Sequence, residues 1–286
     1  MKHIHYHIQN SENLKLFCRA WISDVEIPKG VVILVHGLGE HSGRYNHIGD
    51  ALTKSGYHLA SFDLRGHGLS EGKRGDIPVF EHVLDDVSLF LQDSNERFGE
   101  NLPLFLYGHS LGALIVVTFA LRRAPDLAGI IATSPPFRLS FEPPKATLFV
   151  GRILAKIMPS TTMINNLEHA ALSRDRAIVK AYQDDVYVHN RISAALAISM
   201  LEKGQYALAH ARDFALPLLL MHGTADRITS PEATREFAEK AGPNVDLVLW
   251  EAYYHETHND IGKDQVISKL VSWIEAKTHP NKENLP

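Results

Sequence analysis

A serine in a glycine-bounded turn carries the clearest chemical signal in the sequence. Gly108, Ser110 and Gly112 form a G-x-S-x-G pattern that follows the apolar run 103–107 and precedes a helical pattern over 111–122. A nucleophile on a strand–turn–helix junction of this kind projects at the carboxyl edge of a sheet, and the flanking glycines remove Cβ atoms that would clash. The pattern therefore predicts Ser110 as a nucleophile.

A serine nucleophile needs a base, and the base needs an acid that fixes its tautomer. Where a serine nucleophile lies on a strand–turn–helix junction of this kind, the chain order is serine, then aspartate or glutamate, then histidine. Asp226 follows the apolar run 216–221, and His255 follows the run 245–250. Both residues would lie on the sheet edge that carries Ser110, so Asp226 is the predicted acid and His255 the predicted base.

Each of these assignments has a competitor. His258 lies three residues after His255 and is the alternative base, but His255 is nearer to the end of its strand. Asp260 is the alternative acid, although its place at the start of a helix is explained by capping. We favour His255 and Asp226.

The developing oxyanion of an acyl-transfer reaction needs two N–H donors. One is the backbone N–H of Leu111, which directly follows Ser110 at the start of a helix. The other is expected in the loop after the strand 31–35, where the sequence reads His36-Gly37-Leu38-Gly39. The predicted donor there is the backbone N–H of Leu38.

The same loop supports a rival function. Gly37, Gly39 and Gly43 follow a strand, and Asp63 comes 20 residues after the last glycine, as in a dinucleotide-binding site. The last glycine spacing is one residue too long, however, and Glu40 would occupy space that a pyrophosphate needs. A nucleotide-binding oxidoreductase is therefore the weaker hypothesis, as is a non-catalytic scaffold that only binds a ligand.

The 17 histidines and the single cysteine do not predict a metal site. His3, His5 and His7 share one face of an expected strand, which is more typical of an exposed edge. His255 and His258 are one residue too close together for the H-E-x-x-H zinc motif. We expect no metal and no other cofactor, and a lone Cys18 excludes an intrachain disulfide.

The elements that would position these residues alternate along the chain. Continuous apolar runs at 31–35, 58–62, 103–107, 127–133, 216–221 and 245–250 indicate strands buried on both faces. Helical patterns lie between them, at 45–54, 79–95, 111–122, 232–240 and 261–278. A hairpin is expected over 3–22. The result is an α/β fold with a mostly parallel central sheet flanked by helices.

One stretch, residues 137–213, shows only helical patterns, and we name it the cap segment. It predicts a helical cap inserted between two strands of a core formed by 1–136 and 214–286. Within it, residues 148–158 carry a wide apolar face. Two interpretations of this face stay open: packing on the sheet, or lining an acyl tunnel and contacting a membrane.

Composition narrows the classes of partner. A formal net charge of −4 over 286 residues argues against a nucleic-acid partner. The amino-terminal residues lack an apolar signal sequence, and no run of 18 apolar residues exists. These observations predict a cytoplasmic protein, with peripheral membrane contact through the cap as an open alternative; they do not predict an oligomeric state.

The motifs together resemble the monoacylglycerol lipase (lysophospholipase-like) branch of the α/β-hydrolases. The resemblance covers residues 31–274 and depends most on the H-G-x-G-E-H-x-x-R-Y loop at 36–45. Further matching segments are D-L-R-G-H-G-L-S at 63–70, the serine turn, S-R-D at 173–175, G-T-A-D at 223–226 and the Tyr254-His255 pair.

The resemblance implies an esterase that releases fatty acid and glycerol from monoacylglycerols, with a cap that admits the acyl chain. It assigns Ser110, Asp226 and His255 as the catalytic residues and Leu38 and Leu111 as the oxyanion donors, in agreement with the residue-level argument. A general carboxylesterase, a lysophospholipase or a peptidase would use the same residues, so the substrate is the most open part of the prediction.

Overall fold

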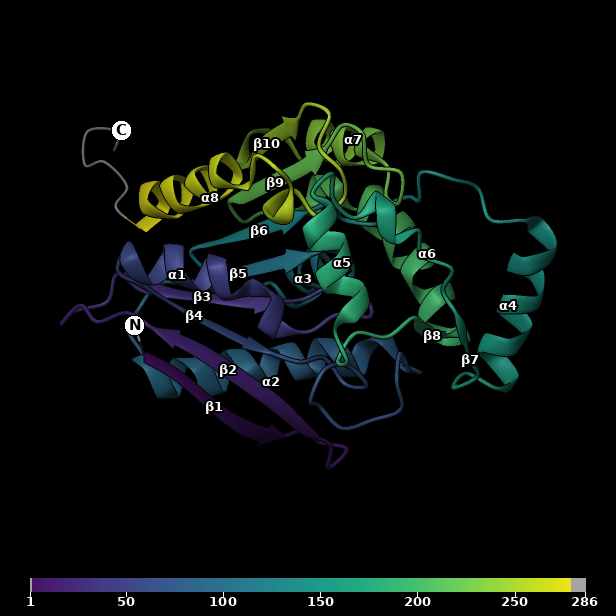
Figure 1. Ribbon diagram of the computed structural model, residues 1–286, viewed down its shortest axis with the longest axis horizontal. Coiled ribbons are helices and arrows are strands. Elements are labelled where there is room, and N and C mark those ends of the chain that lie inside the picture. Colours follow the sequence, from purple (N-terminus) through teal and green to yellow (C-terminus); the bar gives the residue numbers. More distant parts are fainter. Residues whose placement is uncertain (1, 279–286) are drawn as a thin grey trace.

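A computed structural model describes residues 2–278 and contains one central eight-stranded sheet (Figure 1). Its strand order is β1-β2-β4-β3-β5-β6-β9-β10. The six strands from β4 to β10 in this order pair in parallel, whereas β1 and β2 are antiparallel to their neighbours. The predicted α/β fold with a mostly parallel sheet is confirmed. The strands are β1 (Lys2–Gln9), β2 (Lys15–Ile22), β3 (Gly30–Val35), β4 (Tyr57–Phe62), β5 (Leu104–His109), β6 (Gly129–Thr133), β9 (Leu218–Gly223) and β10 (Val245–Trp250).

Helices cover both faces of this sheet, which explains why the strands read as continuous apolar runs. In β3, Val31, Ile33 and Val35 belong to one buried cluster and Val32 and Leu34 to another. The first cluster includes side chains of α2 (Phe80–Phe98), α3 (Leu111–Arg123) and α7 (Pro231–Ala241). The second includes side chains of α1 (Asn46–Lys54) and α8 (Lys263–Thr278). Every strand of the central sheet except β1 therefore contributes to both clusters, and the carboxyl edge of the parallel strands is left for the site.

The hairpin expected over 3–22 is present as β1 and β2, which pair from Lys2–Ile22 to Gln9–Lys15. His3, His5 and His7 lie on its exposed face, beside the rings of Trp21 and Phe17. Their exposure fits the expectation of an edge strand.

The cap segment enters after β6 and returns to the sheet at β9 (Figure 1). It contains α4 (Lys145–Ile157), α5 (Arg176–Asp184) and α6 (Ala194–Ala209). It also contains a two-stranded sheet of β7 (Thr162–Ile164) and β8 (Arg191–Ser193), which the sequence did not predict. Strands of three residues are too short to show an alternation of apolar and polar positions.

Helix α4 stands apart from the sheet and contacts α6 (Figure 1). None of its residues is buried, although its sequence is largely apolar. Its apolar side chains therefore do not pack into the sheet core. None of the helices among residues 2–278 is both long and apolar enough to cross a membrane.

Candidate active site

Ser110 occupies the sharp turn between β5 and α3. Its backbone has φ 51° and ψ −119°, a conformation that L-residues rarely adopt. The glycines on either side are required by contact. A Cβ atom on Gly108 would lie 2.3 Å from the Gly112 carbonyl oxygen, and one on Gly112 would lie 1.9 Å from the Val35 carbonyl oxygen. The local sequence thus forces Ser110 out of the strand and onto the sheet edge.

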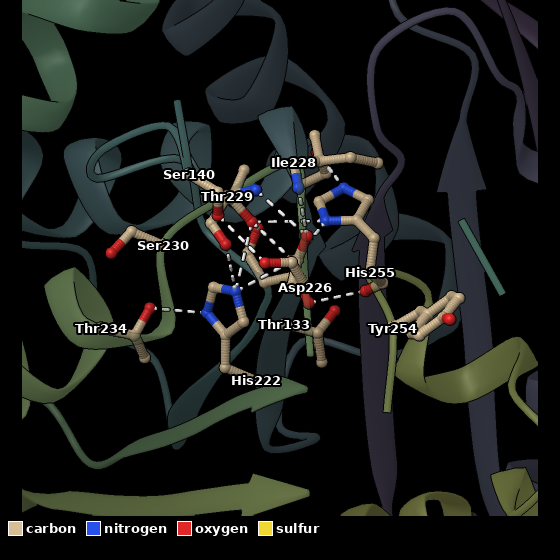
Figure 2. A network of polar contacts seen from close by, with 12 residues as sticks. Thr133, Ser140, His222, Asp226, Ile228, Thr229, Ser230, Thr234, Tyr254 and His255 are labelled. Atoms are coloured by element: carbon tan, nitrogen blue, oxygen red, sulfur yellow. Dashed lines mark hydrogen bonds and ion pairs between the residues drawn. The ribbon is translucent and has the colours of Figure 1, made fainter. Parts of the chain in front are cut away.

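The structure brings the three predicted residues together. Ser110 Oγ lies 2.9 Å from His255 Nε2, and His255 Nδ1 lies 2.7 Å from Asp226 Oδ2. Figure 2 shows the Asp226 carboxylate beside the His255 ring. When the ring is neutral with its proton on Nδ1, Ser110 donates to Nε2 and Nδ1–H donates to Asp226. This is the arrangement that a serine nucleophile and its base require.

Asp226 is buried and accepts hydrogen bonds at both oxygens. Oδ1 accepts from the backbone N–H groups of Ile228, at 2.7 Å, and Thr229, at 3.1 Å. Oδ2 accepts from His255, from the Thr229 hydroxyl at 2.8 Å and from His222 at 3.0 Å. Burial opposes ionisation, but the nearby His255 and the hydrogen bonds from His222 and His255 outweigh it and hold the pKa of Asp226 well below its ordinary value. The group is therefore a carboxylate.

His255 is fixed through its backbone as well as its ring. Its carbonyl accepts a hydrogen bond of 2.6 Å from the hydroxyl of Ser134, and its N–H donates to the Ala171 carbonyl of the cap segment. Burial alone would lower the pKa of His255, but the charge of Asp226 and the hydrogen bond to it raise the pKa above its ordinary value. A raised pKa makes the ring a stronger proton acceptor.

The alternative base, His258, and the alternative acid, Asp260, make other contacts. His258 is buried between rings, stacked on Tyr45 at 5.0 Å and edge-on to His109 at 4.6 Å, and both of its ring nitrogens lack a hydrogen-bond partner. Burial lowers its pKa well below the ordinary value. Asp260 accepts from Arg174 at 2.8 Å and from the N–H of Tyr254, and so anchors the cap segment to the loop of His255.

The loop predicted to hold the second oxyanion donor lies against the nucleophile. A Cβ atom on Gly37 would lie 3.3 Å from Ser110 Cβ, so this loop and Ser110 are in close contact. Leu38 and Ser110 line the same cavity, and Leu111 is the first residue of α3. The N–H groups at the start of a helix have no partner within the helix, which leaves that of Leu111 free to serve a ligand.

A buried ion-pair network that the sequence did not reveal supports this loop. Glu40 accepts from the Gly37 N–H at 2.6 Å, from the Tyr45 hydroxyl at 2.7 Å and from Arg44 at 2.6 Å. Arg44 also forms a bidentate pair with Glu256, with both distances 2.7 Å. Burial opposes the charge of Glu40, but the charge of Arg44, the nearby His109 and His36 rings and the hydrogen bond from Tyr45 lower its pKa to about 2. The network therefore links the Gly37–Leu38 turn to the residue after His255.

The glycines of the rival dinucleotide pattern have other uses in the structure. Gly39 has φ 77°, and a Cβ atom on it would lie 2.3 Å from the carbonyl oxygen of His189 in the cap segment. Asp63 is buried, and its oxygens accept from the N–H and hydroxyl of Ser42 and from the N–H of Leu69. This carboxylate is thus not available to a ribose. Among residues 2–278, no group of three or more His, Cys, Asp or Glu side chains is placed to hold a metal ion.

A cavity of about 900 Å³ opens above Ser110 between the sheet edge and the cap segment. The side of α4 that faces it carries Leu148, Gly151 and Leu154, and α6 contributes Ile198 and Leu201. The charged residues in the lining are Glu40, Glu168, Arg227 and Glu256. Of these, Glu40 and Glu256 are already paired with Arg44, so the space near Ser110 is predominantly apolar.

A nucleophile elbow with an aspartate-oriented histidine on the carboxyl edge of a mostly parallel sheet defines a serine hydrolase of the α/β-hydrolase fold. Comparison with protein families agrees, since residues 26–262 match the family model described as serine aminopeptidase, S33. The chain belongs to this family, and it is an esterase or lipase of the monoglyceride lipase type.

Individual relatives support the same placement. The chain is 31% identical over 262 residues to a monoacylglycerol lipase from Mycolicibacterium smegmatis, covering 89% of this chain and 90% of the relative. The crystal structure of Paleococcus ferrophilus monoacylglycerol lipase superposes with a TM-score of 0.84 at 33% identity, covering 92% of this chain and 99% of the other. An uncharacterized abhydrolase domain-containing protein from Dictyostelium discoideum is 36% identical over 279 residues, but the chain spans only 29% of its length.

Proposed function

We propose that the protein hydrolyses monoacylglycerols to fatty acid and glycerol through a covalent acyl-enzyme. The observation that carries the proposal is the joined geometry of Ser110, His255 and Asp226 at the floor of an apolar cavity. An apolar wall stabilises a fatty acyl chain by removing its surface from water, whereas a short polar ester gains little from it.

The first half-reaction forms the acyl-enzyme. Ser110 Oγ attacks the ester carbonyl carbon while its proton passes to His255 Nε2, 2.9 Å away. The resulting oxyanion accepts hydrogen bonds from the N–H groups of Leu38 and Leu111. Asp226 stabilises the charged ring of His255. The bond to the glycerol oxygen then breaks, and that oxygen takes the proton from His255, which releases glycerol.

The second half-reaction releases the acid. Water replaces glycerol beside His255, which accepts one proton as the water oxygen attacks the acyl carbon. The second tetrahedral oxyanion uses the same two N–H groups. The bond to Ser110 breaks, the serine oxygen recovers the proton from His255, and the fatty acid leaves. The protein returns to its starting state, and no step requires a cofactor.

A series of substrates tests the proposal. Monoacylglycerols of 8, 12, 16 and 18 carbons would be compared with matched lysophospholipids, short p-nitrophenyl esters and aminoacyl amides, using kcat/KM. We expect kcat/KM to rise with chain length and to be highest for a monoacylglycerol. A preference for lysophospholipids, for short esters or for aminoacyl amides would show instead a lysophospholipase, a general carboxylesterase or a peptidase, and would refute the proposed substrate.

We also propose that α4 contacts a membrane surface, from which such substrates must be taken. Its outward side chains include Phe149, Ile153 and Ile157, which are 65%, 43% and 68% exposed and do not line the cavity. Arg152 and Lys156 are exposed on the same helix, which carries no acidic residue. An apolar face flanked by cations favours an anionic bilayer surface.

Vesicle flotation tests the contact. The wild type should float with vesicles of phosphatidylcholine and phosphatidylglycerol, and a Phe149→Ser/Ile157→Ser variant should not. Val25→Ser/Ile27→Ser, at exposed apolar positions in the loop between β2 and β3, is the matched control and should float as the wild type does. Equal flotation of all three proteins, or flotation of none, would refute the role of α4.

A further inference from the structure

His222 is a buried histidine that the proposed reaction does not use, yet it contacts the acid. It lies on β9, four residues before Asp226, and its side chain is fully buried. Figure 2 shows its ring on the opposite side of the Asp226 carboxylate from His255. A buried polar ring needs hydrogen-bond partners, and these partners show which ring nitrogen of His222 carries the proton.

The contacts of His222 fix the position of its proton. Nε2 lies 3.0 Å from Asp226 Oδ2 and 3.1 Å from the Thr229 carbonyl oxygen. A carboxylate and a carbonyl can only accept, so Nε2 must carry the proton. On the other side of the ring, Nδ1 lies 2.7 Å from the Thr234 hydroxyl in α7. Because Thr234 can donate, the contact supplies Nδ1 with the donor that it needs.

The oxygen contacted by His222 is the one that serves His255. Asp226 Oδ2 accepts from His255 Nδ1 at 2.7 Å, from the Thr229 hydroxyl at 2.8 Å and from His222 Nε2 at 3.0 Å. Each additional donor spreads the negative charge of the oxygen and makes it a weaker acceptor toward His255. Together with the Thr229 hydroxyl and the two backbone N–H groups on Oδ1, His222 also holds the carboxylate against rotation away from the His255 ring. The position and the basicity of Asp226 therefore both depend on His222.

We propose that His222, held by Thr234, is a positioning residue that orients the Asp226 carboxylate and limits its basicity toward His255. The chain of contacts then runs from Thr234 in α7 through His222, Asp226 and His255 to Ser110. The proposal rests on the proposed function, because it takes Asp226 and His255 as the acid and the base of the reaction.

A histidine that only fills the core would be equally buried. The test therefore needs a measurement that responds to proton transfer from Ser110 to His255. The rate of Ser110 phosphonylation by a fluorophosphonate provides it, because this rate follows activation of the nucleophile and does not depend on the natural substrate. The other ionisable groups near His255 are Glu40, Glu256, His109 and His258, and all of them are unchanged in the variants.

His222→Leu removes the donor. We expect the plateau rate of phosphonylation to fall by about 10- to 100-fold, because a carboxylate that is less firmly held no longer keeps the His255 ring aligned with Ser110. We also expect the acid limb of the rate to move to higher pH, since a more basic carboxylate holds the His255 proton more tightly. His222→Gln keeps an N–H near the Nε2 position and should restore both values to nearly those of the wild type.

Thr234→Val keeps the shape of the threonine while removing its hydroxyl. It tests the contacts from Thr234 through His222 to Asp226 even if His222→Leu does not fold. Its rate should lie between those of the wild type and His222→Leu. The proposal is overturned if the three variants keep the acid limb and the plateau rate of the wild type, or if His222→Gln loses as much rate as His222→Leu. A wild type that is not labelled at Ser110 would refute the proposed function itself, and the proposal with it.

Discussion

Replacing Glu40 by glutamine would remove the charge at the centre of the buried network while keeping its shape. In the wild type the carboxylate is fully buried, and its pKa is lowered from 4.5 to about 2. Such a depression corresponds to about 3 kcal/mol of folding free energy near pH 7. Because the folded pKa is the lower one, this contribution is complete above the unfolded value and is lost as the pH falls through the folded value. At pH 3.5 it should amount to about 2 kcal/mol.

Urea unfolding followed by circular dichroism measures the effect. We expect Glu40→Gln to lower the free energy of unfolding by about 3 kcal/mol at pH 7 and by less at pH 3.5. Glu168→Gln is the matched control, because Glu168 is also paired with an arginine but its side chain is 61% exposed, and it should change stability by less than about 1 kcal/mol. A loss at pH 7 no larger than in the control, or one that grows as the pH falls, would refute the account of the network.

Three further predictions concern the site. His255→Ala should lower kcat by about 10⁴-fold or more, whereas His258→Ala should keep kcat within about tenfold of the wild type; the reverse order would make His258 the base. The acid limb of the pH profile of kcat/KM should lie above pH 6.5, because Asp226 raises the pKa of His255 and only the unprotonated ring accepts the serine proton. An acid limb below pH 6.5 would contradict the role of Asp226. Gly112→Ala should lower the free energy of unfolding by more than about 3 kcal/mol, because its Cβ would lie 1.9 Å from the Val35 carbonyl oxygen. Gly151→Ala should not destabilise the protein, because the nearest atom to its Cβ is the flexible end of Ile198 at 3.3 Å. Equal losses of stability in the thermal melts of the two variants would refute the steric explanation.

The sheet could be predicted from the sequence because its strands are buried on both faces. The run 31–35 becomes Gly30–Val35 and the run 103–107 becomes Leu104–His109, so the ends differ by one or two residues. Such shifts arise where strand pairing continues beyond the apolar run, as it does at Gly30, Gly108 and His109. Inside the cap segment β7 and β8 were missed, because their pairing is set by contacts with distant residues and not by a local pattern.

The three central residues of the site could be predicted because chain order and strand ends fix their place. Their supporting contacts could not. Arg44 pairs with Glu256, which lies 212 positions away in the sequence. For Glu40 the sequence indicated only that its side chain would occupy space that a pyrophosphate needs, and not that it would pair with Arg44. His222 carried one local signal, a histidine next to a glycine at the end of a buried strand, but nothing in the sequence showed that its ring would meet Asp226. The sequence shows which residues follow the end of each strand. It does not show which loop side chains meet once the loops fold back over the sheet edge.

The proposed function depends above all on Ser110 as the nucleophile of an acyl-enzyme reaction on monoacylglycerols. The most direct measurement is the hydrolysis of a long-chain monoacylglycerol by the wild type and by Ser110→Ala, with unfolding curves for both proteins. Ser110→Ala should fold as the wild type does and lose activity by about 10⁵-fold or more. Retained hydrolysis by the folded variant would contradict this role of Ser110.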